Sequence, residues 1–148
     1  MRLDLHLNYR PSLCCRTSAQ MFSHVVLGVS DFERAFQFYS AIAKELGLVP
    51  KFKDVRAENA GWMPSSSDRP LLLIGKPFDG QPHCAGKGQM IGFLAQNRGV
   101  VDRAYFAAGS MGGLCEGPPG LRSHYHPTFY GAYFWDLDGN KICVCCYK

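Results

Sequence analysis

Histidine and cysteine side chains carry most of the acid–base, nucleophilic and metal-binding chemistry that this sequence could support. His24 lies in the alternating segment FSHVVLGVS, which predicts a strand. Cys143 lies in a second such segment, KICVCCY, on the face opposite to Ile142. His124 and His126 stand two positions apart in a Gly- and Pro-rich stretch, so an extended backbone would direct both imidazoles to one side. These four side chains are the first candidates for a functional site.

The C-terminal stretch Phe129–Tyr147 must position Cys143. Two apolar runs flank the sequence DLDGN at positions 136–140, and Asp-Gly and Gly-Asn tolerate the positive φ of a tight β-hairpin. Before this turn, aromatic and small residues fill both alternation phases, as is typical of a strand covered on both faces. After the turn the two faces differ. We expect one face to pack on a helix and the face with Cys143 to look toward open space.

The strand that holds His24 is followed by the clearest helix signal in the chain. Ser30-Asp31-Phe32-Glu33 matches a capping box, so the helix is predicted to begin at Ser30 and to end at Gly47. Apolar residues recur at intervals of three and four and form one continuous stripe: Phe32, Ala35, Phe36, Tyr39, Ile42, Ala43 and Leu46.

Three short strand candidates follow this helix, at Val49–Lys53, Arg56–Trp62 and Leu71–Ile74. Residues 77–87 contain Pro and Gly and are interpreted as a linker. The pattern then restarts with a strand at Met90–Ala95 and a helix whose N-cap is Asn97.

The second helix is predicted to end at Gly112, and a loop at Gly117–Pro127 holds Arg122, His124, Tyr125 and His126. The C-terminal hairpin closes this half, so the order strand, helix, several strands occurs twice. We predict an α+β fold in one domain, 21–148, made of two βαβββ modules that form a curled mixed sheet around a cavity. Module one spans 21–76 and module two spans 88–147.

Composition excludes several classes of protein. The chain has 148 residues and a formal net charge of +4, with Lys and Arg scattered rather than clustered, so no nucleic-acid partner is expected. No apolar run is long enough to span a bilayer, so no membrane is expected either. Seven cysteines, an odd number, come without a secretory signal or paired C-x-x-C units. We therefore expect reduced thiols in a cytoplasmic protein.

Residues 1–20 do not continue the pattern of the domain. They show no clear period and contain four charged residues, Arg2, Asp4, Arg10 and Arg16. We interpret them as a disordered tail, with a short added strand through Leu3, Leu5 and Leu7 as the alternative.

The chain resembles the vicinal oxygen chelate superfamily, which includes glyoxalases, bleomycin-resistance proteins and extradiol dioxygenases. The segments that carry the resemblance are FSHVVLGVSDFERAFQFY, GKGQMIGFLAQ and GAYFWDLDGNKI. The resemblance covers Met21 to Tyr147 and implies two βαβββ modules around a shared cavity. Relatives commonly cover their open sheet edges by pairing, so a homodimer is predicted.

The resemblance also implies where a metal would be held, on the first and last strands of each module. His24 occupies the first of these positions and is the one typical ligand. Leu71–Ile74 offer no oxygen, Met90 stands where His is usual, and Cys143 stands where Glu is usual. Such a set is poor for a divalent cation.

Three interpretations of the site remain open. The cavity could bind a small organic molecule without a resident cofactor, with His24 as the hydrogen-bond partner or catalytic base. His24, Met90 and Cys143 could instead form a soft site for Cu(I). As a third interpretation, His24 and a loop histidine, His124 or His126, could complete a divalent-metal site.

We expect the cavity between the two modules to bind a small organic molecule that is largely apolar or aromatic, through residues that are aromatic, sulfur-containing or basic. Whether the protein is an enzyme is left open; the alternative to a binding protein is a metal-dependent lyase or isomerase of the glyoxalase kind. The predicted ligand-binding residues are His24, Trp62, Met90, Arg122, His124, Tyr125, His126, Phe129, Tyr133 and Cys143.

Overall fold

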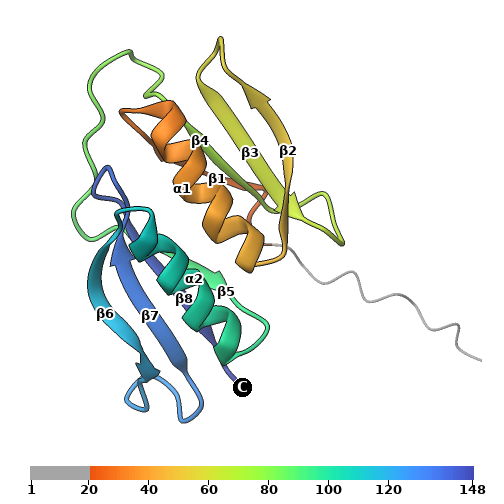
Figure 1. The fold of residues 1–148 in the computed structure, drawn as a ribbon, viewed down its shortest axis with the longest axis vertical. Helices are drawn as coiled ribbons and strands as arrows, with labels where there is room; N and C mark the ends of the chain where they lie inside the picture. The colour runs from red at the N-terminus through yellow and green to blue at the C-terminus, as the bar shows by residue number, and fades with distance from the viewer. Residues whose placement is uncertain (1–20) are drawn as a thin grey trace, which may run out of the picture.

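The structure is a computed structural model that describes residues 21–148; the prediction made for residues 1–20 lies outside the described residues. Module one comes first in the chain (Figure 1) and consists of β1 (His24–Gly28), α1 (Phe32–Glu45), β2 (Leu48–Asp54), β3 (Asn59–Pro64) and β4 (Leu71–Gly75). Module two consists of β5 (Ile91–Leu94), α2 (Arg98–Ser110), β6 (Leu114–Leu121), β7 (Tyr130–Trp135) and β8 (Lys141–Cys146).

The two modules repeat one topology. Each contains a four-stranded sheet, in the order β1-β4-β3-β2 and in the order β5-β8-β7-β6. The first strand of each module pairs in parallel with the last, and the other neighbours are antiparallel. The predicted α+β fold of two βαβββ modules is thereby confirmed. Between β4 and β5 the chain has no helix or strand, in the region predicted to be a linker.

The N-cap of helix α1 lies one residue later than the capping pattern predicts. This N-cap is Asp31, whose carboxylate accepts the N–H of Arg34 at 3.1 Å. Ser30 instead donates its backbone N–H to Oδ1 of Asp138, in the hairpin turn of module two, at 2.8 Å. A contact between residues this far apart in the chain could not be read from the local capping pattern.

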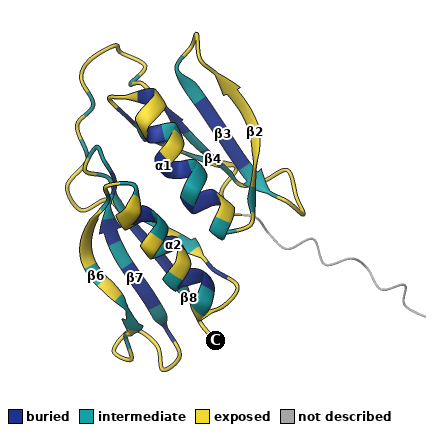
Figure 2. Cartoon of the chain, viewed as in Figure 1, coloured by how far each residue is buried: buried dark blue, intermediate teal, exposed yellow. Residues whose placement is uncertain are grey.

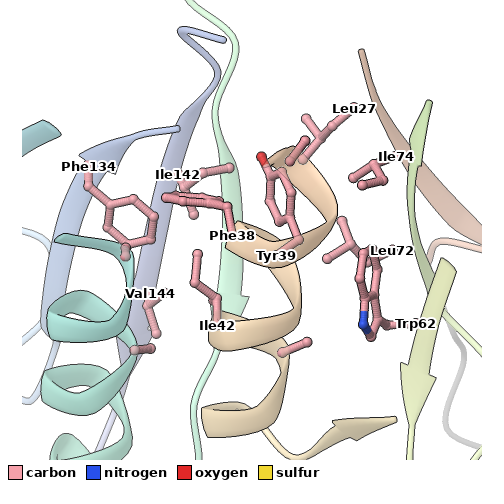
Figure 3. Packing of buried hydrophobic residues seen from close by; sticks show 14 of the residues in the cluster. Leu27, Phe38, Tyr39, Ile42, Trp62, Leu72, Ile74, Phe134, Ile142 and Val144 are labelled. Carbon is pink, nitrogen blue, oxygen red and sulfur yellow. The ribbon is translucent and has the colours of Figure 1, made fainter. Parts of the chain in front are cut away.

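Helix α1 also buries more of its surface than a single apolar stripe would. Phe38, which is outside the predicted stripe, is fully buried, and its ring makes an edge contact with Phe134 of β7. Figure 3 shows the reason, because Phe38 faces the residues of module two while Tyr39 faces those of module one. Helix α1 therefore packs against residues of both modules and contributes to one continuous core.

Strands β2 and β6, each at one edge of its sheet, are largely exposed (Figure 2). Most residues of β2 and β6 are exposed, whereas β3 and β7 are largely buried. The loop predicted from Gly117 was wrong in its first part, because β6 extends through Gly117 to Leu121. Its pairing with β7 shifts register on both sides of Gly117, and an edge strand tolerates Pro118 and Pro119 since it needs no second partner.

The turn between β7 and β8 fastens module two to module one. Asp136, which is 4% exposed, accepts hydrogen bonds from Tyr39 Oη at 2.5 Å and from Asn140 Nδ2 at 2.8 Å. The same amide group of Asn140 donates to the carbonyl oxygen of Gly28 at 3.0 Å. Hydrogen bonds from the DLDGN turn thus join the last hairpin to the end of β1 and to helix α1.

Within residues 21–148, no helix combines the length and the apolar character needed to cross a membrane.

Candidate functional site

Strand alternation separates a helix-covered face from an open face in each sheet. In module one Leu27, Leu72 and Trp62 face α1, so His24 and Val26 lie on the open face. In module two the residues Ile142 and Val144 are fully buried beneath α2. The open face of that sheet is formed by Gly92, Cys143 and Tyr133, which are direct neighbours in the register of β5, β8 and β7. Functional side chains are to be sought on these open faces.

A pocket of about 490 Å³ lies on the open face of module two, and we call it the β8 pocket. It follows β8, whose alternate residues form its floor, and the loop before β7 forms one wall. Its lining consists of Met90, Gly92, Tyr125, His126, Phe129, Tyr133, Lys141, Cys143, Cys145 and Tyr147.

Aromatic rings build one end of the β8 pocket. Phe129 contacts Tyr125 and Tyr147, with ring centroids 5.6 Å and 5.3 Å apart, and both pairs are close to perpendicular. His126 makes a similar edge contact with Tyr147 at 5.4 Å. Such rings offer apolar faces and positive edges, so they suit a flat apolar ligand.

His126 has a defined hydrogen-bonding direction. Its Nδ1 accepts the backbone N–H of Thr128 at 3.2 Å. An imidazole nitrogen that accepts a hydrogen bond carries no proton, so the neutral ring bears its proton on Nε2. His126 is therefore equipped to donate one hydrogen bond from Nε2.

The sulfur and phenol groups on the pocket floor are uncharged. Burial raises the pKa of the Cys143 thiol to about 12, and the neighbouring Cys145 acts in the same direction. Burial likewise raises the pKa of Tyr133 to about 12, and the neighbouring Cys143, when it ionises, acts in the same direction. A thiol with a raised pKa is a poor nucleophile. The structure therefore gives no support for Cys143 as an activated nucleophile.

A smaller hollow of about 250 Å³ lies between the first strands of the two modules. Val25 and Leu71 line it from module one, and Ile91 and Phe93 line it from module two. Met90, which is 48% exposed, borders both this hollow and the β8 pocket. The β8 pocket therefore opens toward the boundary between the modules at Met90.

The structure brings together six of the predicted ligand-binding residues and leaves four elsewhere. Met90, Tyr125, His126, Phe129, Tyr133 and Cys143 line the β8 pocket. Arg122 lies behind Tyr133, with its guanidinium carbon 5.9 Å from the ring centre, and His124 packs on Tyr125 with ring centroids 4.1 Å apart.

Trp62 and His24 are the two members that lie farther away. Trp62 is 1% exposed and stacks on Phe36 of α1, so the structure places it in the core rather than in a pocket wall. His24 is exposed on β1, where its Nδ1 lies 2.7 Å from Oγ of Ser23, and it is absent from the lining of the β8 pocket.

The positions at which the superfamily would hold a metal do not fit one here. Leu71, which pairs with His24 on β1, has no ligand atom, and Met90 and Cys143 offer sulfur where a hard divalent cation prefers oxygen or imidazole. Within residues 21–148, no three His, Cys, Asp or Glu side chains come close enough together to hold a metal ion. We therefore derive no chemistry through a metal.

Four lining residues of the β8 pocket were not predicted, namely Gly92, Lys141, Cys145 and Tyr147. The last three share the alternation phase of Cys143 on β8, so the strand pattern itself could have indicated them.

His83 of the linker was also not predicted as a site residue. Its ring lies on Gly28 of β1, where a Cβ atom would come within 2.3 Å of His83 Nδ1, and its buried Nε2 has no hydrogen-bond partner in the described part of the chain.

The fold agrees with comparisons with known proteins. The sequence model of the Glyoxalase/Bleomycin resistance protein/Dioxygenase superfamily matches residues 21–144, so the chain belongs to this superfamily. A crystal structure of a glyoxalase/bleomycin resistance protein from Albidiferax ferrireducens T118 is 35% identical, with a TM-score of 0.76, over 87% of this chain and 100% of that one.

More distant structures share the fold alone. The fosfomycin resistance protein FosX from Mesorhizobium loti is 16% identical with a TM-score of 0.61, over 86% of this chain and 92% of that one. A putative glyoxalase from Bacillus halodurans is 18% identical with a TM-score of 0.63, over 86% and 96% of the two chains. The comparison with curated proteins gives no match.

Proposed function

We propose that this protein binds a small, largely apolar or aromatic organic molecule in the β8 pocket, without a complete metal site. The observation that carries the proposal is the lining of this pocket, in which aromatic rings and sulfur atoms surround a few polar groups. Pockets of several hundred cubic ångströms with this kind of lining are typical small-molecule sites. The expected ligand stacks against Phe129 and Tyr147 and accepts a hydrogen bond from His126 Nε2.

The proposal is one of binding rather than catalysis. The thiol and phenol groups of the floor are protonated, so they offer a surface and weak hydrogen bonds instead of an activated nucleophile. His24, which was predicted to act as base or hydrogen-bond partner, is not needed by this pocket. A metal-dependent lyase or isomerase would need ligands that the family positions do not supply.

A pocket-filling substitution tests the proposal. Gly92 lies on the floor of the β8 pocket, and a Cβ atom built there would meet no atom within 4 Å. Gly92→Leu should therefore fill the pocket without displacing neighbours. We expect the neutral fluorescent probe N-phenylnaphthylamine to bind the wild-type protein and to bind Gly92→Leu at least about tenfold more weakly.

Gly109 provides the matched control, because a Cβ atom there also meets no atom within 4 Å and the residue lies on α2. Gly109→Leu should bind the probe as the wild type does. Circular dichroism of both variants should show the wild-type fold. Equal probe affinity in the wild type and in Gly92→Leu would show that the β8 pocket is not the binding site.

A further inference from the structure

We propose that the natural ligand of the β8 pocket is an organic anion, an apolar ring-bearing molecule with one negatively charged group. This inference rests on the proposed function and names its ligand class. It follows from the charges around the pocket. Lys141 belongs to its lining, Arg122 lies behind the lining residue Tyr133, and no Asp or Glu side chain belongs to the lining.

Lys141 is a lining residue whose ammonium group is held near the pocket. Its Nζ lies 2.7 Å from Oε1 of Glu116 and 5.3 Å from the ring centre of Trp135. Glu116 borders a separate hollow of about 450 Å³, on the side of the linker, and does not line the β8 pocket. Lys141 borders both spaces, so its ammonium can turn from Glu116 toward an anion in the β8 pocket.

Arg122 is the second cation. Its guanidinium donates to the carbonyl oxygens of Pro118 at 2.8 Å and of Leu121 at 3.2 Å. These acceptors are neutral, and in residues 21–148 no carboxylate forms an ion pair with Arg122. Its positive charge extends to the pocket floor, where it opposes the rise in the pKa of Cys143 and of Tyr133.

No other group in the lining cancels these charges. Cys143, Cys145 and Tyr133 are acidic groups on the floor, and burial raises the pKa of each, which favours the protonated forms. Arg122, which has no carboxylate partner among the described residues, therefore makes the potential at the pocket floor positive. The ammonium of Lys141 adds to this potential when it turns away from Glu116, and apolar walls strengthen the effect of a charge. A ligand with a carboxylate, phenolate or sulfonate group gains from this potential, whereas a cationic ligand of equal size is repelled.

Two probes with a shared ring system separate this inference from the proposed function. Anilinonaphthalenesulfonate carries a sulfonate on the scaffold that N-phenylnaphthylamine presents without a charge. We expect the wild-type protein to bind the anionic probe about tenfold more tightly, since a hydrogen bond to a charged group is stronger than one to a neutral group. This difference should shrink as salt is raised, while the affinity for the neutral probe should not fall.

Variants of the ion pair should shift the affinity for the anionic probe in opposite directions. Lys141→Met removes the cation and should weaken its binding about tenfold. Glu116→Gln removes the competing carboxylate and should strengthen its binding about two- to fivefold. If the pair were only structural, both variants would act in the same direction, because each breaks the same contact.

The ion pair between Lys76 and Glu58, with atoms 2.6 Å apart in module one, is the matched control. Lys76→Met and Glu58→Gln make the same changes in net charge and should leave both affinities unchanged. Equal affinity of the wild type for the two probes, or no effect of Lys141→Met, would overturn the anion inference while leaving the proposed function intact. Failure of both probes to bind would overturn the proposed function itself.

Discussion

The hydroxyl of Tyr39 donates a hydrogen bond of 2.5 Å to Oδ2 of Asp136, and this bond joins helix α1 of module one to the last hairpin of module two. Both side chains are buried. Burial, followed by the charge of Asp136, raises the pKa of Tyr39, so the phenol keeps its proton and remains a donor. Asp136 also accepts the backbone N–H groups of Asp138 and Asn140 at 2.9 Å and 2.7 Å.

Removing this hydroxyl should destabilise the protein. Tyr39→Phe leaves a buried carboxylate oxygen with one donor fewer, and we expect the free energy of unfolding to fall by about 1–3 kcal/mol. Urea denaturation followed by circular dichroism measures this change. Tyr130→Phe is the control, since Tyr130 also donates to a carboxylate, that of Asp102, at 2.8 Å in a less buried place. If the free energy of unfolding falls no more in Tyr39→Phe than in Tyr130→Phe, the hydrogen bond from Tyr39 does not hold the two modules together.

The local elements of this fold could be predicted from sequence because their signals are local. The hairpin at 136–140 follows from residues that tolerate positive φ, and Gly139 has φ of +83°. The second helix and its cap at Asn97 follow from periodicity and capping chemistry. The hydrogen bond that Asp136 accepts from Tyr39 could not be predicted, since the two residues are distant in the chain.

The candidate site was predictable only in part, for a similar reason. Aromatic residues before and on β7 could be assigned to a cavity by type, and the structure places Phe129 and Tyr133 in one pocket. Trp62 has the same character in sequence, yet it lies under α1, because alternation within β3 decides its face. Lys141 was overlooked since a single lysine beside a turn is usually a solvated group.

Cys143 should react slowly with thiol reagents. With a pKa of about 12, its thiolate fraction at about pH 8 is on the order of one in ten thousand, and the residue is 3% exposed. Peptide mapping after brief treatment with iodoacetamide should find the exposed Cys84 modified well before Cys143. His24→Ala should not alter the rate at Cys143. A marked slowing in this variant would restore the activated nucleophile that we have set aside.

Stability should decline on the alkaline side of neutrality. Burial raises the pKa values of Tyr39, Tyr133 and Cys143 above those of the unfolded chain, which are about 10 for Tyr and about 8.5 for Cys. The folded state therefore binds these protons more tightly. The corresponding stability is fully present below about pH 8.5 and is lost as the pH rises through the folded values.

Urea denaturation at a series of pH values measures this decline, and Cys143→Ala should reduce its slope between about pH 9 and pH 12. Cys84→Ala removes an exposed thiol and should leave the slope unchanged. An unfolding free energy that stays constant up to about pH 11 would show that burial does not hold these protons as inferred.

Protein purified without a chelator should contain far less than one metal ion per chain. One imidazole, a thioether and a protonated thiol form a poor set for a hard divalent cation. EDTA should leave the melting temperature unchanged, because there is no bound ion to withdraw from the native state. Metal analysis by mass spectrometry decides the point. Stoichiometric Zn²⁺, Ni²⁺ or Fe²⁺ that is lost in His24→Ala would instead favour the metal-dependent lyase or isomerase.

The protein should be a homodimer at micromolar concentration. The first strands of the two modules, β1 and β5, are sheet edges, and apolar side chains are exposed on their open faces, with Val26 at 60% and Leu94 at 73%. Burial of such a side chain contributes about 1.5–3 kcal/mol, and a two-fold axis counts each contact twice. Val26→Lys should therefore raise the dissociation constant measured by sedimentation equilibrium, whereas Leu114→Lys on the outer strand β6 should not. A wild-type protein that sediments only as a monomer would contradict the prediction.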